Sequence, residues 1–190
     1  MLVQNISITT GAEIAYLLQK TINEHPPVSP QKTIAIAAGH GARPLGTYLT
    51  GLGYITETQL QATLQQQGQC KEQGTEWTIG DLLVQKGVIK PQVLSTVLMV
   101  QLLDRLLDPR QPQPQLLGEH LISRGIITPT QLAHAIQQQL YLQQTGTKVR
   151  LGYLLIQQGL LDTQTLTEVL HDQWHAHNQF SQTITTIELT

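Results

Sequence analysis

Three histidines near the C-terminal end of the chain have residue types and a spacing that could bind a metal. His171 and His175 are four residues apart, so on a helix they would lie on one face, and His177 follows two residues later. Zinc would require a third and a fourth ligand in fixed geometry. The alternative is a hydrated helix end, where histidine lies near the negative pole of the helix dipole. The sequence favours this alternative, and we predict no metal site.

Other residues of catalytic type do not combine into an active site. Cys70 is expected on a loop between glutamine-rich and charged residues, with no base beside it. The glycine-rich turn at 39–46 matches no dinucleotide fingerprint, and no phosphate-binding loop of the Gly-x-x-x-x-Gly-Lys-Ser/Thr type occurs. The remaining acidic candidates are expected at scattered helix starts or surface positions: Glu57, Asp81, Glu119, Asp162 and Glu168. We therefore predict no catalytic residues and no enzyme.

The amino-acid composition excludes further classes of protein function. The chain has 190 residues, of which 40% are apolar, 13% charged and 4% aromatic, with a net charge of −2. Such a weakly charged surface argues against a nucleic-acid binder, which needs a lysine- and arginine-rich face. The most apolar stretch, 93–103, is about half a membrane span and contains Ser95, Thr96 and Gln101. With one cysteine and no visible secretory signal, we expect a soluble cytoplasmic protein without membrane insertion.

A repeat organises most of the chain. Four segments of equal length, 44–67, 78–101, 116–139 and 150–173, align without gaps. Each has a Leu-Gly or Ile-Gly step near its start. A leucine follows three residues after the glycine of this step, and a second glycine follows four residues after that leucine. Spaced apolar residues come next, and a glutamine ends the segment. The linkers 68–77 and 140–149 are equal in length and the linker 102–115 is longer, which groups the units into two pairs. We refer to the segments as units 1 to 4 and to the pairs, 44–101 and 116–173, as the first and second modules.

Each unit is predicted to be a short helix, a turn and a second helix. In unit 4, Leu151, Leu154 and Leu155 have the spacing of an amphipathic helix. Gly159 then stands where a left-handed helix cap is expected, as do Gly53, Gly87 and Gly125 in the other units. Asp162 and Thr128 are expected N-caps, the latter followed by Pro129. Since such hairpins cannot bury their own apolar faces, the prediction is an all-α protein of tandem helical hairpins.

The flanks complete the predicted organisation. Residues 1–43 are expected to hold one helix, 10–24, followed by a proline-rich linker and an apolar run at 33–38 of uncertain type. A proline-rich tether lies within the linker 102–115, and 174–190 forms a C-terminal tail. The end of the tail, 180–190, is rich in Thr and Ile and is expected to be strand-like or frayed. Trp77 and Trp174 lie at unit boundaries and are predicted to be packing residues, with stacking on a base as the alternative.

The repeat resembles the MshEN domain, which forms the N-terminus of many type II secretion and type IV pilus ATPases and binds cyclic di-GMP through two such motifs. The resemblance rests on the pattern Arg-Leu-Gly, Leu, Gly, Leu, Leu, Gln over residues 44–173. Two features differ from the family. The linkers within the pairs are about twice the usual length, and the leading arginine is present only as Arg150, with Arg43 one residue early in unit 1.

The resemblance implies a cyclic di-GMP site in the second module. There, Leu-Gly steps would let the nucleotide approach the backbone, leucines would cover its apolar faces, and Arg150, with Lys148 nearby, would bind phosphate or the guanine edge. The implied ligand-binding residues are Arg150, Leu151, Gly152, Leu155, Gly159, Gln173, Leu117, Gly118, Leu121 and Gln139.

Two functions therefore stay open, with a third ranked below them. The first is a non-catalytic cyclic di-GMP receptor or adaptor that signals to a protein partner, by resemblance a pilus or secretion apparatus. The second is a structural or protein-interaction module that has lost the nucleotide and kept its partner surfaces, which the missing arginines favour for the first module. The third, a TPR-like scaffold, shares the spacing between the paired units but lacks the Trp, Tyr and Pro pattern of that class.

Overall fold

A computed structural model describes residues 8–29, 43–108 and 116–187, with side chains described as far as residue 175. These residues form helices and contain no strand, which confirms the all-α prediction. The apolar run at 33–38, the glycine-rich turn at 39–41 and most of the proline-rich linker lie outside the described residues. The helices are α1 (Ile8–Glu24), α2 (Leu45–Gly51), α3 (Glu57–Glu72), α4 (Ile79–Gln85), α5 (Pro91–Leu106), α6 (Leu117–Ser123), α7 (Pro129–Gln144), α8 (Leu151–Gln157) and α9 (Thr163–Ile187).

Each unit contributes one short and one long helix, and the local signals of the sequence set their ends. The Thr128 hydroxyl accepts a hydrogen bond from the Gln131 N–H at 3.2 Å, and the Gln131 side chain accepts one from the Thr128 N–H at 2.8 Å, which is a capping box. Asp162 accepts a bond from the Thr165 N–H at 2.6 Å before α9, and this bond lowers the pKa of its carboxyl group. Both N-cap predictions are confirmed.

The glycine that follows each short helix has the predicted left-handed conformation. Gly53, Gly87, Gly125 and Gly159 have φ of 75°, 68°, 66° and 68°. At Gly159, the N–H donates to the Ile156 carbonyl at 2.9 Å and the next N–H, of Leu160, reaches back to the Leu155 carbonyl at 3.0 Å. This pair of bonds satisfies the last carbonyl groups of α8 and turns the chain towards α9.

Within each module the short helix of one unit packs against the long helix of the other. In the first module α2 contacts α5 and α4 contacts α3, and in the second module α6 contacts α9 and α8 contacts α7. The helices of one unit also touch, since Gly46 of α2 lies beneath Leu60 of α3. The two units of a module thus exchange helix contacts, and one buried core cluster joins both modules and α1.

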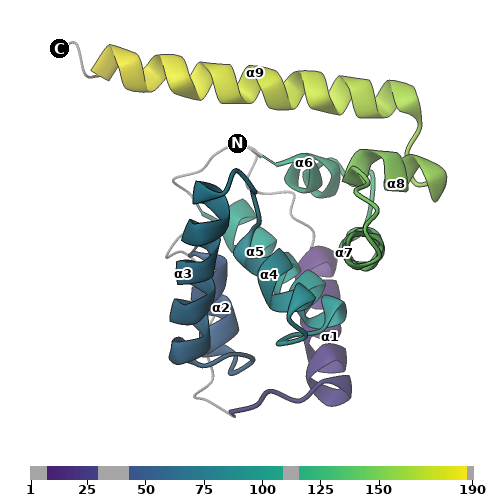
Figure 1. The fold of residues 1–190 in the computed structure, drawn as a ribbon. Coiled ribbons are helices and arrows are strands. Elements are labelled where there is room, and N and C mark those ends of the chain that lie inside the picture. Colours follow the sequence, from purple (N-terminus) through teal and green to yellow (C-terminus); the bar gives the residue numbers. More distant parts are fainter. Residues whose placement is uncertain (1–7, 30–42, 109–115, 188–190) are drawn as a thin grey trace.

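Helix α5 lies near the centre of the molecule and contacts both α1 and α7, which also contact one another (Figure 1). It is buried around most of its circumference, and this includes two hydroxyl residues, Ser95 and Thr96. Both hydroxyl groups form hydrogen bonds to neighbouring helices: Thr96 to Thr21 of α1 at 2.8 Å, and Ser95 to the Gln137 side chain of α7 at 3.0 Å. Within the apolar stretch at 93–103, Ser95 therefore joins the first module to the second, and Thr96 joins the first module to α1.

Helix α9 runs along the end of the molecule nearest α6 and α8 (Figure 1). It continues to Ile187, so the expectation that 180–190 is strand-like or frayed is wrong as far as that residue. The β propensity of Thr and Ile is weak compared with the continuation of a helix already formed, because each added residue gains a hydrogen bond without a new nucleus. Among the described residues, no helix is both long enough and apolar enough to cross a membrane.

Candidate ligand-binding site

The first residues of the short helices carry the Leu-Gly step on which the predicted nucleotide site depends. Arg150 is the N-cap of α8, and its carbonyl accepts bonds from the N–H groups of Tyr153 at 3.1 Å and Leu154 at 3.2 Å. Gly152 is thus the second residue of α8, and Gly118 has the same place in α6. Both glycines are buried.

A leucine of the same unit covers each of these glycines. A Cβ placed on Gly152 would lie 3.0 Å from both methyl carbons of Leu166, and one on Gly118 would lie 2.9 Å from a methyl carbon of Leu132. In the first module, a Cβ placed on Gly46 would lie 2.7 Å from a methyl carbon of Leu60, and one placed on Gly80 would lie 3.0 Å from a methyl carbon of Leu94. The covering leucine follows its glycine at the same sequence separation in every unit, so the missing side chain lets each short helix approach its own long helix.

The leucines assigned to the nucleotide faces lie in the core. Leu121 and Leu155 are 0% exposed, as are their counterparts Leu49 and Leu83. Leu117 and Leu151 are half-buried and pack against the core cluster. In the second module, the three atoms nearest to a Cβ placed on Gly152 all belong to Leu166. The atoms nearest to a Cβ placed on Gly118 belong to Leu132 and Leu102. The two Leu-Gly steps are therefore not each other's nearest neighbours.

The last residue of the motif, glutamine, forms a hydrogen bond between the two units of a module. The Gln139 side chain donates to the Val149 carbonyl at 2.7 Å, immediately before α8. In the first module the bond is reciprocal: Gln67 donates to the Trp77 carbonyl at 2.8 Å, and Gln101 donates to the Arg43 carbonyl at 2.7 Å. In the alignment of the repeat, the position that corresponds to these acceptors for Gln173 is residue 115, which lies outside the described part of the chain. The glutamines that close units 1 to 3 therefore position the entry to a short helix of the other unit.

Arg150 differs from the buried members of the motif because its side chain is exposed. Lys148, in the same α7–α8 connection, places its ammonium 6.0 Å from the centre of the Trp77 ring, at the outer limit of a cation–π contact. Trp77 is partly exposed and belongs to the first module. Lys148 of the second module thus lies beside an aromatic ring of the first.

Arg43 is held by its backbone. Its carbonyl accepts the Gln101 bond, and its N–H donates to the Tyr48 hydroxyl at 3.3 Å. That hydroxyl donates to the Asp104 carboxylate at 2.6 Å. Burial and the bond to Asp104 raise the pKa of Tyr48 to about 12. These contacts fix the backbone before α2, and any residue other than proline could form them, so they leave the role of the Arg43 side chain open.

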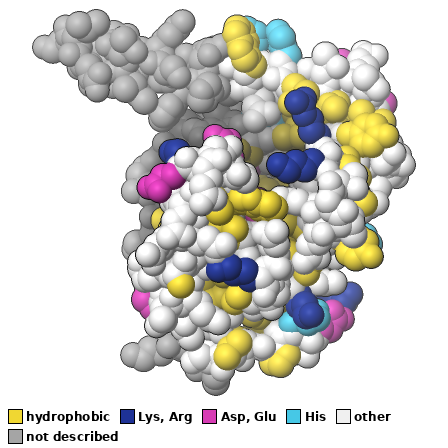
Figure 2. Space-filling model, viewed as in Figure 1, with side chains coloured by type: hydrophobic (Ala, Val, Ile, Leu, Met, Phe, Trp, Pro, Cys, Tyr) yellow, Lys and Arg dark blue, Asp and Glu magenta, His cyan; other side chains and the backbone are white. Residues whose placement is uncertain are grey.

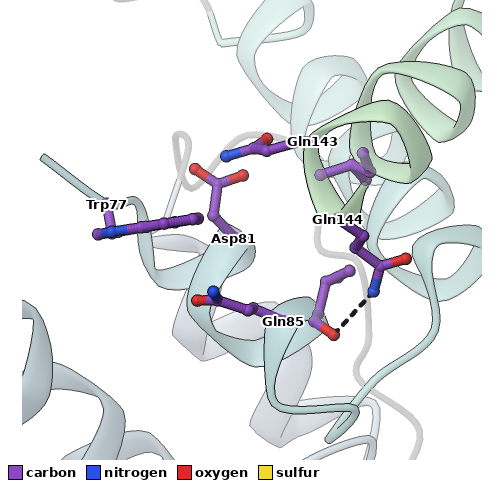
Figure 3. A pocket seen from close by; sticks show the side chains of 7 residues that line it. Trp77, Asp81, Gln85, Gln143 and Gln144 are labelled. Carbon is purple, nitrogen blue, oxygen red and sulfur yellow. Dashed lines mark hydrogen bonds between the residues drawn. The ribbon is translucent and has the colours of Figure 1, made fainter. Parts of the chain in front are cut away.

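Two hollows of the described surface can be compared with a nucleotide site. No predicted site residue lines either of them, although Trp77, beside which Lys148 lies, lines the first. Figure 3 shows the first, between α4 and α7, where Trp77, Asp81, Gln85, Gln143 and Gln144 surround about 10 Å³, the room of one water molecule. The Gln144 side chain bridges the two helices with a bond to the Val84 carbonyl at 3.2 Å. The second hollow, of about 290 Å³, is open and lies beside Ser29, Thr50, Gly53 and Glu57. Ligand pockets generally enclose about 300–1,000 Å³, so the first hollow is too small. The second is close to the lower end of that range, but it is open and none of the predicted site residues lines it.

Several sequence-based assignments of individual residues need correction. Cys70 lies within α3 and not on a loop, because the helix continues past Gly68 to Glu72. Glu119 is a helix-start residue but not a surface one: it is 3% exposed, and Arg105 of α5 places its Nε 2.5 Å from the carboxylate. Trp174 is 60% exposed and is therefore not a packing residue. His171 and His175 lie in the middle of α9, so they do not mark a helix end.

His120 is a buried titratable residue that the sequence pattern did not single out. It is 5% exposed in α6, and its Nε2 has no hydrogen-bond partner among the described residues. Burial and then the neighbouring Arg124 cation lower the pKa of His120, while Glu119 and Asp172 act in the opposite direction. Its counterparts in the other units, Tyr48, Leu82 and Leu154, are equally buried, so alignment of the repeat could have indicated its position.

Comparisons with known proteins bring no further information to this site. No family model matches the chain, and no curated protein or solved structure matches it. The likeness to the MshEN domain therefore depends on the sequence motif alone.

Proposed function

We propose that the chain is a non-catalytic adaptor in which the repeated motif holds the helices of each module together, and in which binding to other molecules takes place on the module surfaces. The observation that carries this proposal is the packing of the glycine of each Leu-Gly or Ile-Gly step beneath a leucine of its own long helix. The glycines, the buried leucines and three of the four closing glutamines all have structural contacts that explain their repetition. Figure 2 shows one face on which most of the surface is uncharged, with separate Lys and Arg side chains, so a protein partner is a better match than a polyanion.

A cyclic di-GMP receptor is the second candidate, and the position of Arg150 favours it. Arg150 is the one arginine in register with the motif, and its side chain is exposed. Lys148, two residues before it, has its ammonium 6.0 Å from the centre of the Trp77 ring. An arginine can bind phosphate or the guanine edge through its planar fork, and an indole ring can stack on a base. On this proposal the buried leucines support the site from below instead of touching the nucleotide. A component of a type IV pilus or type II secretion apparatus is the first partner to test under either candidate.

Calorimetric titration of the full chain with cyclic di-GMP separates the two candidates, with cyclic di-AMP and GTP as controls. The adaptor proposal expects no heat of binding up to high micromolar ligand. The receptor proposal expects saturable binding that Arg150→Ala weakens about 10- to 100-fold, since a hydrogen bond to a charged group contributes about 1.5–3 kcal/mol. Arg43→Ala is the matched control, because it removes the arginine that immediately precedes the first module. Binding that Arg43→Ala abolishes and Arg150→Ala leaves intact would contradict both assignments.

A further inference from the structure

Two histidines of α9 point their ring nitrogens at one another. The Nε2 atoms of His171 and His175 are 3.0 Å apart, and the ring centres are 4.3 Å apart. Both side chains are exposed, and Figure 2 shows histidine side chains at the surface along the described part of α9. Since α9 continues without a break to Ile187, the two residues are held one turn apart on a regular helix. The pair is therefore preorganised and open to solvent.

The contacts of His171 leave its Nε2 available as a ligand. Its Nδ1 lies 3.7 Å from a carboxylate oxygen of Asp172, which favours the tautomer with the proton on Nδ1. The other oxygen of Asp172 forms an ion pair with Arg124 at the end of α6, and this contact holds the carboxylate in place. A carboxylate that accepts a hydrogen bond from the ring is the usual outer partner of a metal-binding histidine. At 3.7 Å, Asp172 is beyond hydrogen-bond distance and acts on the His171 ring through its charge.

We propose that His171 and His175 form a two-histidine binding site for a divalent late transition metal ion of tetragonal coordination, Cu²⁺ or Ni²⁺. Two nitrogens at about 2.0–2.1 Å from one ion lie about 2.9 Å apart at a 90° angle and about 3.3 Å apart at a tetrahedral angle. The observed 3.0 Å is close to the first value. Tetragonal geometry with nitrogen and oxygen ligands is typical of Cu²⁺ and Ni²⁺.

The described residues supply two ligands to this site, His171 and His175. No group of three or more His, Cys, Asp and Glu side chains in the described residues could hold a metal, so water or an added ligand takes the other positions. Before the ion binds, the Nε2–H of one histidine can donate to the Nε2 of the other; binding needs both lone pairs, so the donor ring shifts its proton to Nδ1. His177, the third histidine of the sequence cluster, lies outside the residues whose side chains are described.

Titration of the full chain with Cu²⁺, followed by electron paramagnetic resonance, tests the site. Wild-type protein should bind one equivalent with a spectrum split by two nitrogens, and His171→Asn or His175→Asn should each weaken binding at least about tenfold. His134→Asn, which removes an exposed histidine of α7, is the matched control and should bind as wild type does. All four proteins should give the same circular dichroism, since the altered side chains are exposed.

Selective broadening of the His171 and His175 ring signals by substoichiometric Cu²⁺ in NMR spectra would locate the ion independently. Equal affinity in wild type, His171→Asn and His175→Asn would overturn the proposal, because the ion would then bind elsewhere. Tighter binding of Zn²⁺ than of Ni²⁺ would overturn the tetragonal assignment.

Discussion

The hydroxyl groups of Thr21 and Thr96 lie 2.8 Å apart in the buried interface between α1 and α5. They are 6% and 2% exposed, so water is excluded from both. This bond joins the N-terminal helix to the central helix of the repeats, and it gives α1 a specific register against α5 where apolar contacts alone would allow the helices to slide.

Replacing one of these threonines should be more harmful than replacing both. Thr96→Val leaves the Thr21 hydroxyl buried without its partner, at a cost of about 1–3 kcal/mol in the free energy of unfolding, whereas Thr21→Val with Thr96→Val should be nearly neutral. Urea denaturation of the single and double variants measures this difference. A double variant whose loss equals the sum of the two single losses would show that the bond does not couple the helices.

Gly152→Ala should destabilise the protein because the new methyl group meets Leu166. Gly68→Ala is the control: Gly68 is an exposed residue of α3 with open space around its Cα, so alanine there should stabilise by about 0.5–1 kcal/mol. In a Leu166→Ala background, Gly152→Ala should lose its cost or become stabilising, since the clash is gone and the helix propensity of alanine remains. The double-mutant cycle consists of thermal melts of the wild type, the two single variants Gly152→Ala and Leu166→Ala, and the double variant. If the cost of Gly152→Ala is the same in both backgrounds, Leu166 is not the residue that requires this glycine.

The glycines after the short helices should differ in their tolerance of alanine. Gly159→Ala should cost roughly 1 kcal/mol, because its φ of 68° is unfavourable for a residue with a side chain and nothing else is nearby. Gly53→Ala should cost clearly more, since its Cβ would lie 1.8 Å from the Ser29 carbonyl oxygen. The N-terminal segment would have to move, so faster proteolysis after α1 is also expected. Equal losses in the two variants would show that the 27–29 segment does not pack on Gly53.

Stability should fall in mildly acidic solution through His120. Its folded-state pKa lies below the ordinary value of 6.5, so the unfolded chain binds the proton more tightly; the contribution is complete above pH 6.5 and is lost as pH falls through the folded-state pKa. His120→Leu places at this position the residue found at its counterparts Leu82 and Leu154, and it should flatten the profile between pH 6.5 and 5. Urea midpoints across that range, with exposed His134→Gln as control, measure the effect. An unchanged slope in His120→Leu would exclude His120 as the cause.

Local signals in the sequence predicted where the helices begin and end, but they did not predict which helices of different units pack together. Thr128, Asp162 and the four capping glycines act through neighbours a few residues away, so sequence alone identified them. The exchange of partners between units depends on contacts between residues far apart in the chain, such as Gln101 with Arg43, and apolar periodicity cannot specify them. The burial of Glu119 was missed for the same reason, since its partner Arg105 lies outside its own module.

The glycine of the Leu-Gly step packs against a leucine in the structure, a role that differs from the one its sequence suggested. This glycine was expected to admit a ligand, yet a covering leucine recurs at one fixed separation from it in all four units: Leu60, Leu94, Leu132 and Leu166. The repeat therefore already contained the packing signal. A small residue and a large one that recur at a fixed separation can indicate a contact as well as a binding surface. Arg150 is not explained by packing, and it is the residue on which the nucleotide question depends.

The reciprocal glutamine bonds of the first module have the form of a twofold dimer interface contained in one polypeptide. Gln67 holds the entry to α4 and Gln101 holds the entry to α2, as equivalent residues do across an isologous contact between identical subunits. A chain of one unit could satisfy the same bonds only by pairing with a second copy. The first module thus has within one chain the contact pattern of a homodimer, and because its two halves are covalently joined, they need not be identical in sequence.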